Sequence, residues 1–598
     1  MTTPDTLPRW DLTALFPAPD SPELAASERA LASEIATLEA LWDELGIDRR
    51  DTPPPPAVAA AAFERLAPGL NTAHERAERL LAYLYCAVAA DSRDQAAQAA
   101  LSRLQQQTMR LALLGTRLTA WLGSVDTEAL IADSPAAATH AFLVRQAKRR
   151  AAHLMSPAEE ALAAELELTG STAWSRLYRT YASQISVPLE QHGERRELPM
   201  AAVRNLAFDT DREVRRRAYE AELAAWERAA VPIAAALNSI KGEVGALARR
   251  RGYDSPLDVA LLDNNIDRAT LEAMLGAAEE RFPDFRRYLR AKARALGLPA
   301  LAWYDLFAPV GAAGRAWPYD EATRFITERF GAYSPRLRDL AARAFRERWV
   351  DAPPRDGKSG GAFCMPFGDG DSRILTNYQP TFTAVATLAH ELGHAYHNLN
   401  LAGRTPLQRD TPMTLAETAS IFCETLATQA ALEAAAPDEQ ITILDASLMD
   451  ACQVVVDITS RFRFEQAVFE RRRERDLAPD ELCELMRDAQ RATYGDGLDA
   501  EALHPYMWAA KPHYYGATFY NFPYMFGLLF GLGLYAQYRR DPAAFAPRFD
   551  ELLASTGMDD PAGLAARFGI DLRDRAFWRA SLDVIRGEIE RFEALAGR

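Results

Sequence analysis

Helical periodicity constrains the fold of this chain more than any other feature of the sequence. Before residue 350, Ala, Leu, Glu and Arg prevail, and apolar residues recur at intervals of three and four, as they do from residue 205 to residue 252. Strand signals are scarce, and no long internal repeat is evident. The chain is therefore predicted to be mainly α-helical.

The first break in this pattern lies at residues 184–200, where Val, Ile and Leu flank a Gly turn. This segment predicts a hairpin at the seam between two regions. We expect an N-terminal helical region at residues 1–200 and a second region at residues 201–598.

The second break, at residues 352–380, is rich in Pro and Gly and contains two β-like pieces, 362–367 and 373–378. A long amphipathic helix is predicted next, at residues 381–403. The GKS at 357–359 does not indicate a phosphate-binding loop, because Ala352 replaces the glycine that this motif requires, no strand precedes the segment and no helix begins after it.

Composition excludes several classes of function. The 598 residues carry 68 Lys and Arg against 83 Asp and Glu, a net charge of −15, so the chain lacks the basic surface that binds nucleic acid. Five Cys without a CxxC pair are typical of a reducing compartment. The most apolar stretch, residues 522–536, is too short to span a membrane and predicts a buried helix. No secretory leader is visible, so we expect a soluble, cytoplasmic protein with neither nucleic acid nor membrane as a partner.

The sequence HELGH at residues 390–394 is the strongest chemical signal. Residues i and i+4 share one face of a helix, so His390 and His394 can present two imidazoles to one metal ion. Glu391 is rotated to one side, where it can reach a metal-bound water without binding the metal.

A third ligand is needed, because two His hold zinc weakly. The following helical segment, residues 413–432, places Glu417 and Glu424 two turns apart on one face. Glu417 is either the third ligand or the last residue of a capping box that begins at Thr414. Glu424 is a reserve ligand or an acceptor for a zinc-bound imidazole.

Amide hydrolysis also requires donors to the oxyanion that forms when water attacks the carbonyl. His513, Tyr520 and Tyr524 gather before the most apolar helix, and the two tyrosines are one helical turn apart. The alternative interpretation of these aromatic residues is a hydrophobic core.

These segments together resemble the oligoendopeptidase F branch of the thimet oligopeptidase family of zinc metallopeptidases. The resemblance extends from WDLTALFP near the N-terminus through GKSGGAF, RILTNY, LAHELGHAYH and MTLAETASIFCETL to KPHYYGATFYNFPY. It implies that one zinc ion is held by His390, His394 and Glu417 and that Glu391 is the catalytic base. The family's transition-state His and Tyr match His513 and either Tyr520 or Tyr524.

The resemblance further implies a two-lobed helical zincin-type fold around a deep central channel, with a small β-sheet beside the active-site helix. The edge of that sheet is expected to pair with an extended peptide. RILTNY would offer hydrogen-bonding backbone groups, and GGAF would let the peptide approach closely. The expected substrate-binding residues are Gly360, Gly361, Ala362, Phe363, Leu375 and Asn377.

The function predicted from the sequence is zinc-dependent hydrolysis of internal bonds in short unfolded oligopeptides. Residues 201–598 form the catalytic region in this prediction, because they contain the HExxH helix. Two alternatives stay open: a metallocarboxypeptidase of similar architecture, and a peptide-binding protein with a vestigial site. The intact Glu391 argues against the second alternative.

Overall fold

The structure is a computed structural model that describes residues 7–191, 194–311 and 315–597. It divides into two compact units, each assembled from three segments of the chain. Unit 1 comprises residues 1–154, 316–430 and 537–569, and unit 2 comprises residues 155–315, 431–536 and 570–598. The predicted boundary at residue 200 and the predicted channel stay predictions.

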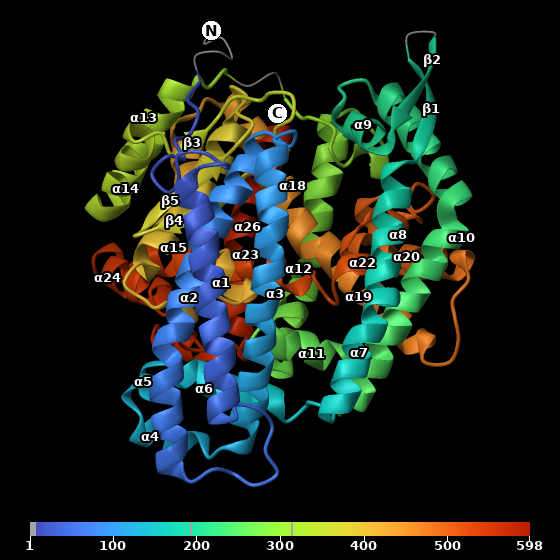
Figure 1. Ribbon diagram of the computed structural model, residues 1–598. Coiled ribbons are helices and arrows are strands. Elements are labelled where there is room, and N and C mark those ends of the chain that lie inside the picture. Colours follow the sequence, from blue (N-terminus) through green and yellow to red (C-terminus); the bar gives the residue numbers. More distant parts are fainter. Residues whose placement is uncertain (1–6, 192–193, 312–314, 598) are drawn as a thin grey trace. The chain divides into compact units, whose positions relative to one another are not determined.

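Unit 1 begins with long helices that pack side by side (Figure 1). Buried side chains such as Trp42, Phe63, Leu80 and Trp121 form their common core, and the Trp42 indole donates to the Leu114 carbonyl at 3.2 Å. The elements that lie wholly in unit 1 are α1 (Pro22–Leu45), α2 (Pro56–Ala90), α3 (Gln95–Ser124), α4 (Thr127–Asp133), α5 (Pro135–Thr139), α6 (Ala141–Ala151), α13 (Tyr319–Tyr333), α14 (Pro335–Arg346), β3 (Val350–Asp351), β4 (Phe363–Gly368), β5 (Asp371–Leu375), α15 (Phe382–Leu401), η4 (Pro406–Gln408), α16 (Met413–Ala416), α24 (Pro542–Leu553) and α25 (Pro561–Ala566).

A three-stranded sheet in the order β3–β5–β4 lies beside α15. β5 pairs in parallel with β3 and antiparallel with β4. The N-terminal segment packs against this sheet: Trp10 contacts Phe363 with ring centroids 6.2 Å apart, and the Asp11 carbonyl accepts from Arg373 at 2.6 Å. The sheet therefore lies between the N-terminal helices and α15.

Unit 2 is built around the long helix α10, whose Trp226, Ile233 and Leu237 are buried. Its elements are α7 (Pro157–Thr169), α8 (Ser171–Ser183), β1 (Ser186–Gln191), β2 (Glu194–Pro199), α9 (Met200–Asn205), η2 (Leu206–Phe208), α10 (Arg212–Arg250), α11 (Pro256–Asp263), α12 (Arg268–Ala295), η3 (Trp303–Asp305), α18 (Pro437–Cys452), the π-helical η5 (Gln453–Asp457), α19 (Ile458–Arg472), α20 (Pro479–Tyr494), η6 (Gly495–Gly497), α21 (Met507–Ala510), α22 (His513–Gly516) and α26 (Arg575–Ala596). Two further helices, α17 (Thr418–Ala434) and α23 (Phe522–Arg540), have residues in both units.

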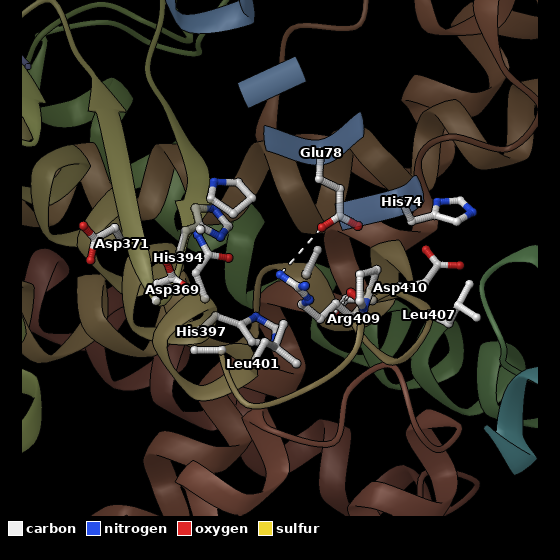
Figure 2. A pocket seen from close by; sticks show the side chains of 18 of the residues that line it. His74, Glu78, Asp369, Asp371, His394, His397, Leu401, Leu407, Arg409 and Asp410 are labelled. Atoms are coloured by element: carbon white, nitrogen blue, oxygen red, sulfur yellow. Dashed lines mark hydrogen bonds and ion pairs between the residues drawn. The ribbon is translucent and has the colours of Figure 1, made fainter. Parts of the chain in front are cut away.

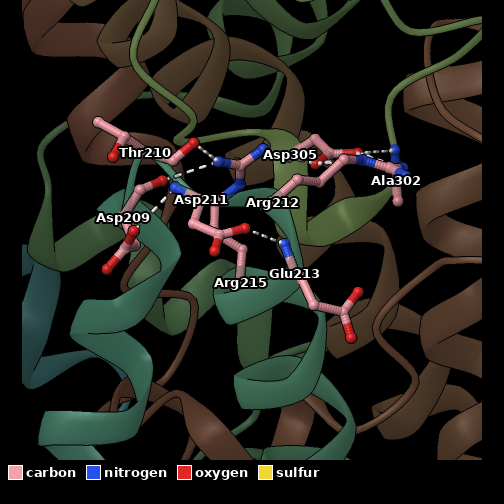
Figure 3. Close-up of polar contacts among 8 residues, drawn as sticks. All are labelled: Asp209, Thr210, Asp211, Arg212, Glu213, Arg215, Ala302 and Asp305. Atoms are coloured by element: carbon pink, nitrogen blue, oxygen red, sulfur yellow. Dashed lines mark hydrogen bonds and ion pairs between the residues drawn. The ribbon is translucent and has the colours of Figure 1, made fainter. Parts of the chain in front are cut away.

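The start of α10 is anchored by a buried carboxylate (Figure 3). Asp305 is fully buried, and it accepts from Arg212 at 2.9 Å and from the buried Arg215 at 3.0 Å. The Asp211 side chain caps the helix by accepting from the Glu213 amide at 2.8 Å. These contacts join the first turn of α10 to the segment around residue 305.

The predicted fold class and the predicted hairpin are confirmed. The protein is mainly α-helical with a small sheet beside α15, and β1 and β2 form the predicted antiparallel hairpin. All five cysteines are free. Among the described residues, no helix combines the length and the hydropathy that a membrane span requires.

One expectation does not fit the topology. β5 is the central strand, so its backbone groups pair with β3 and β4, and Leu375 is fully buried. RILTNY therefore cannot offer its strand backbone to a peptide, and Leu375 cannot contact one. β3 was not predicted, because a strand of two residues leaves no pattern in the sequence.

Candidate metal centre

Helix α15 carries the HELGH motif, and its opposite face packs into the core. Thr381 caps its N-terminus by accepting from the Ala384 amide at 3.3 Å, and Val385, Leu388 and Leu392 anchor its buried face. His390 and His394 lie one turn apart, with ring centroids separated by 5.0 Å. Both imidazoles are partly exposed, so they remain open to a ligand.

Glu417 lies directly opposite these two imidazoles. Its Oε2 is 3.2 Å from His390 Nε2 and 3.4 Å from His394 Nε2. The three ligand atoms lie within 4.8 Å of one another, and no other such group occurs in the part of the chain that the structure describes. The Ser420 hydroxyl donates to the same Glu417 oxygen at 2.7 Å and orients the carboxylate.

The capping-box alternative for Glu417 is not adopted. Thr414 lies inside α16, whose N-cap is Pro412, and Glu417 forms the junction between α16 and α17. The Glu417 carboxylate faces the imidazoles across the two helices.

Gly393 explains how α17 approaches α15 so closely. A Cβ at this position would lie 2.5 Å from the Ala419 carbonyl oxygen and 2.6 Å from the Ser420 Cα. Only glycine leaves room for backbone at that distance. The central Gly of HELGH is thus the contact that brings Glu417 to the two histidines.

Glu424 occupies the supporting position that was one of its two predicted alternatives. Its Oε2 lies 2.9 Å from His390 Nδ1, the ring nitrogen that faces away from Glu417. A carboxylate on Nδ1 fixes the tautomer and orientation of an imidazole whose Nε2 binds a metal.

Glu391 lies on the same helix with 5% of its surface exposed, and its Oε2 has no hydrogen-bond partner among the described residues. Burial raises the pKa of the Glu391 carboxyl, and the neighbouring His390 and His394 partly offset this. A buried carboxylate with an unused acceptor is suited to take a proton from a bound molecule.

The donor set fits zinc. Two imidazole nitrogens and one carboxylate oxygen are a ligand set of catalytic zinc sites, in which a fourth position stays open for water or substrate. Such a site also requires a proton acceptor beside the metal, and the unpartnered Oε2 of Glu391, the residue after His390, can serve as one. A hard cation such as Mg²⁺ prefers oxygen ligands and fits this set poorly.

His513, Tyr520 and Tyr524 form a second cluster, in unit 2. The ring centroids of His513 and Tyr520 are 5.6 Å apart, those of His513 and Tyr524 6.3 Å, and those of the two tyrosines 5.3 Å. All three side chains are half-buried. Burial, together with the nearby Arg461 and Lys511, lowers the pKa of His513 and favours its neutral imidazole. Their role as oxyanion donors stays a prediction.

The segment that carries Tyr520 is held by a buried ion pair that the sequence did not reveal. Glu465 accepts from Lys241 at 2.7 Å, from the Phe519 amide at 3.0 Å and from the Asn521 side chain at 2.9 Å. Lys241 also donates to the Ala517 carbonyl at 3.2 Å. Phe519 has a positive φ of 50°, which this network stabilises.

The predicted substrate-binding segment before β4 is a glycine loop organised by two buried or partly buried side chains. Asn377 donates to the carbonyls of Ser359 and Gly361 at 3.0 and 3.1 Å. Lys358, the lysine of GKS, is fully buried against Asp351 at 2.8 Å and also donates to the Thr376 carbonyl. Lys358 is thus a structural residue. A peptide role for Gly360, Gly361, Ala362, Phe363 and Asn377 stays a prediction.

Comparison with known proteins identifies a family and a shared fold. The profile of peptidase family M3 matches residues 205–584, and that of Oligopeptidase F matches residues 122–186. The group B oligopeptidase PepB of Streptococcus agalactiae is 26% identical over 444 residues, covering 74% of each chain.

Two solved structures share the fold. A putative peptidase from Chlamydophila abortus superposes with a TM-score of 0.82 at 22% identity, covering 99% of both chains. The oligoendopeptidase-F from Enterococcus faecium superposes with a TM-score of 0.71 at 18% identity, covering 96% of this chain and 99% of that one.

The helical fold, the cluster of His390, His394 and Glu417, and the family match identify the protein as a metallopeptidase. More specifically, the chain belongs to peptidase family M3, which confirms the resemblance drawn from its motifs.

Proposed function

We propose that this protein is a zinc-dependent endopeptidase that hydrolyses internal bonds of short unfolded oligopeptides. One zinc ion would be held by His390, His394 and Glu417, with Glu424 orienting His390. The observation that carries the proposal is the convergence of three ligand atoms within 4.8 Å beside the unpartnered carboxylate of Glu391.

Bound zinc would supply a Lewis acid that lowers the pKa of water toward about 7 and polarises a carbonyl. Glu391 removes a proton from the attacking water and returns it to the leaving amine. Burial raises the pKa of the Glu391 carboxyl, which suits a group that accepts a proton in the first step and returns it in the second. His513 and Tyr520 or Tyr524 donate to the oxyanion.

The peptide is proposed to pair with the outer edge of β4, which no other strand of the described residues occupies, because β5 is already paired on both sides. Gly360 and Gly361 precede this edge, and their lack of side chains lets a peptide backbone approach. Phe363 packs its ring against Trp10 and Tyr85, so it contributes backbone groups only. The cytoplasmic location and the absence of nucleic-acid and membrane partners stay predictions.

Glu391→Gln tests the role of the base. The amide cannot accept the water proton, so kcat falls by about 10³-fold, while zinc content stays at one ion per chain because no ligand is changed. Rates on a quenched peptide and metal analysis after dialysis check both expectations. Glu44→Gln, an exposed change on α1, is the control and retains full activity. Turnover of Glu391→Gln near the wild-type rate would show that another group is the base.

Peptides that are blocked at both ends separate the endopeptidase from the two alternatives. An endopeptidase cleaves them, a carboxypeptidase does not, and a peptide-binding protein binds without turnover. Cleavage that a chelator abolishes and added zinc restores is the expected result.

A further inference from the structure

A cavity of about 630 Å³ lies beside His394 in unit 1 (Figure 2). One side is the second half of α15, and the others are the turn between β4 and β5, helix α2, and the connection at residues 406–411. Its volume is in the range of small-molecule binding sites. An extended peptide advances about 3.3 Å per residue, so side chains close to a bond cleaved at the cluster come within reach of this cavity.

The wall formed by α2 and the connection carries excess negative charge. Arg409 pairs with both Glu75 and Glu78, so the single positive charge of its guanidinium is shared between two carboxylates. Asp410 adds a third, and among the described residues no Lys or Arg nitrogen lies within 4.0 Å of its carboxylate. Burial lowers the pKa of the His74 imidazole more than the neighbouring Asp410 raises it, so the neutral imidazole is favoured there.

The opposite side of the cavity is also acidic. Figure 2 shows Asp369 and Asp371 across the cavity from Glu78 and Asp410. Asp371 is paired with Arg343 at 2.7 Å, whereas Asp369 is 92% exposed and 3.9 Å from Arg79. The charge not already matched by a close cation is therefore concentrated at Asp410.

Apolar side chains complete the lining. Leu143, Leu401 and Leu407 face the same space as the carboxylates. A long side chain with an apolar stem and a charged head makes both kinds of contact at once, because the stem packs on leucines while the head meets the carboxylates.

We propose that this cavity is a substrate subsite for a cationic group of the peptide, with Asp410 as its counter-charge. The group is either a Lys or Arg side chain near the scissile bond or the free N-terminal ammonium. The inference rests on the proposed peptidase function and specifies the substrates that this site prefers. Neither His74 nor Asp410 belongs to a sequence motif, so only the fold brings them into one cavity with His394.

The test compares peptides that differ by one charge. Quenched peptides blocked at both ends carry Lys or the uncharged norleucine at one position, scanned along both sides of the cleaved bond. A second pair has a free or an acetylated N-terminus. The readout is the ratio of kcat/KM for the charged and uncharged members of a pair, which does not depend on the fraction of active enzyme.

We expect the wild type to favour the charged peptide about fivefold at one position, as one ion pair allows. Asp410→Asn lowers the ratio toward one, and Asp410→Lys inverts it and favours a Glu peptide. Asp410 is exposed and unpaired with Lys or Arg, so these changes leave the fold intact. Glu44→Gln removes one charge from α1 and keeps the wild-type ratio.

A preference confined to the Lys series identifies the side chain as the ligand, and one confined to the free terminus identifies the ammonium. The absence of any preference, or one that survives in both Asp410 variants, overturns the subsite. Failure of the zinc-loaded wild type to cleave any of these peptides overturns the proposed function instead.

Discussion

At the scale of single residues, the metal centre depends on Gly393, because a side chain at this position would clash with the backbone of α17. His390 and His394 share a helix face by their spacing alone, but Glu417 reaches them only because α17 backbone lies against Gly393. The sequence predicted that the two imidazoles lie on one face of a helix. It left Glu417 as either a metal ligand or the last residue of a capping box. The contact that decides between them joins residues on different helices, and such a contact has no local signature.

Gly393→Ala is expected to loosen this centre. The new Cβ would approach the Ala419 carbonyl to 2.5 Å, so α15 and α17 must separate by about 1 Å, which typically costs about 1–3 kcal/mol of stability. Glu417 moves with α17, and zinc affinity falls at least about tenfold, as it does when the geometry of a ligand is disturbed.

Competition with a chromogenic chelator measures this affinity. Gly403→Ala, just beyond α15, is the matched control, because a Cβ there meets no atom within 4 Å. Equal zinc affinity in the two variants would mean that the helix contact does not set the position of Glu417.

At the scale of elements, prediction succeeded where the signal lies within a few residues. α15, the β1–β2 hairpin and the separate strands β4 and β5 have their own caps, turns or alternation, and all were predicted as elements. The central place of β5 was missed, because it depends on pairing with the two residues of β3. The ion pair that supports the Tyr520 segment was also missed, because Lys241 and Glu465 come from α10 and α19, which are distant in the sequence.

Removing this support should affect catalysis and stability separately. Glu465→Ala leaves Lys241 buried without a counter-charge, and the free energy of unfolding falls by about 3–5 kcal/mol. The double variant Lys241→Met with Glu465→Leu contains no buried charge at these two positions and regains stability. It still lacks the bonds to Phe519 and Asn521, so the Tyr520 segment is released.

We expect kcat of this double variant to stay low with little change in KM, because the tyrosine donors act mainly in the transition state. Urea unfolding and steady-state kinetics on the same preparations check both parts. A double variant that is stable and fully active would leave the ion pair with a purely structural role.

At the scale of the whole molecule, each unit is completed only when three distant chain segments come together. In unit 1 the metal ligands lie on α15 and at the junction of α16 and α17, and neither element holds them at binding distance by itself. The unfolded chain therefore has no preformed site, and zinc binding is linked to folding. Zinc should stabilise the folded protein by about 2.7 kcal/mol at a free concentration 100-fold above its Kd.

Scanning calorimetry of the chelated protein, with and without added zinc, measures this linkage. We expect zinc to raise Tm by a few degrees and Mg²⁺ to leave it unchanged, because Mg²⁺ prefers oxygen ligands. His394→Ala removes one ligand and abolishes the shift, whereas Glu391→Gln keeps all three ligands and retains it. This pair distinguishes loss of the metal from loss of the base, although both variants are inactive on peptides. A Tm that does not respond to zinc in the wild type would contradict the assignment of His390, His394 and Glu417 as its ligands.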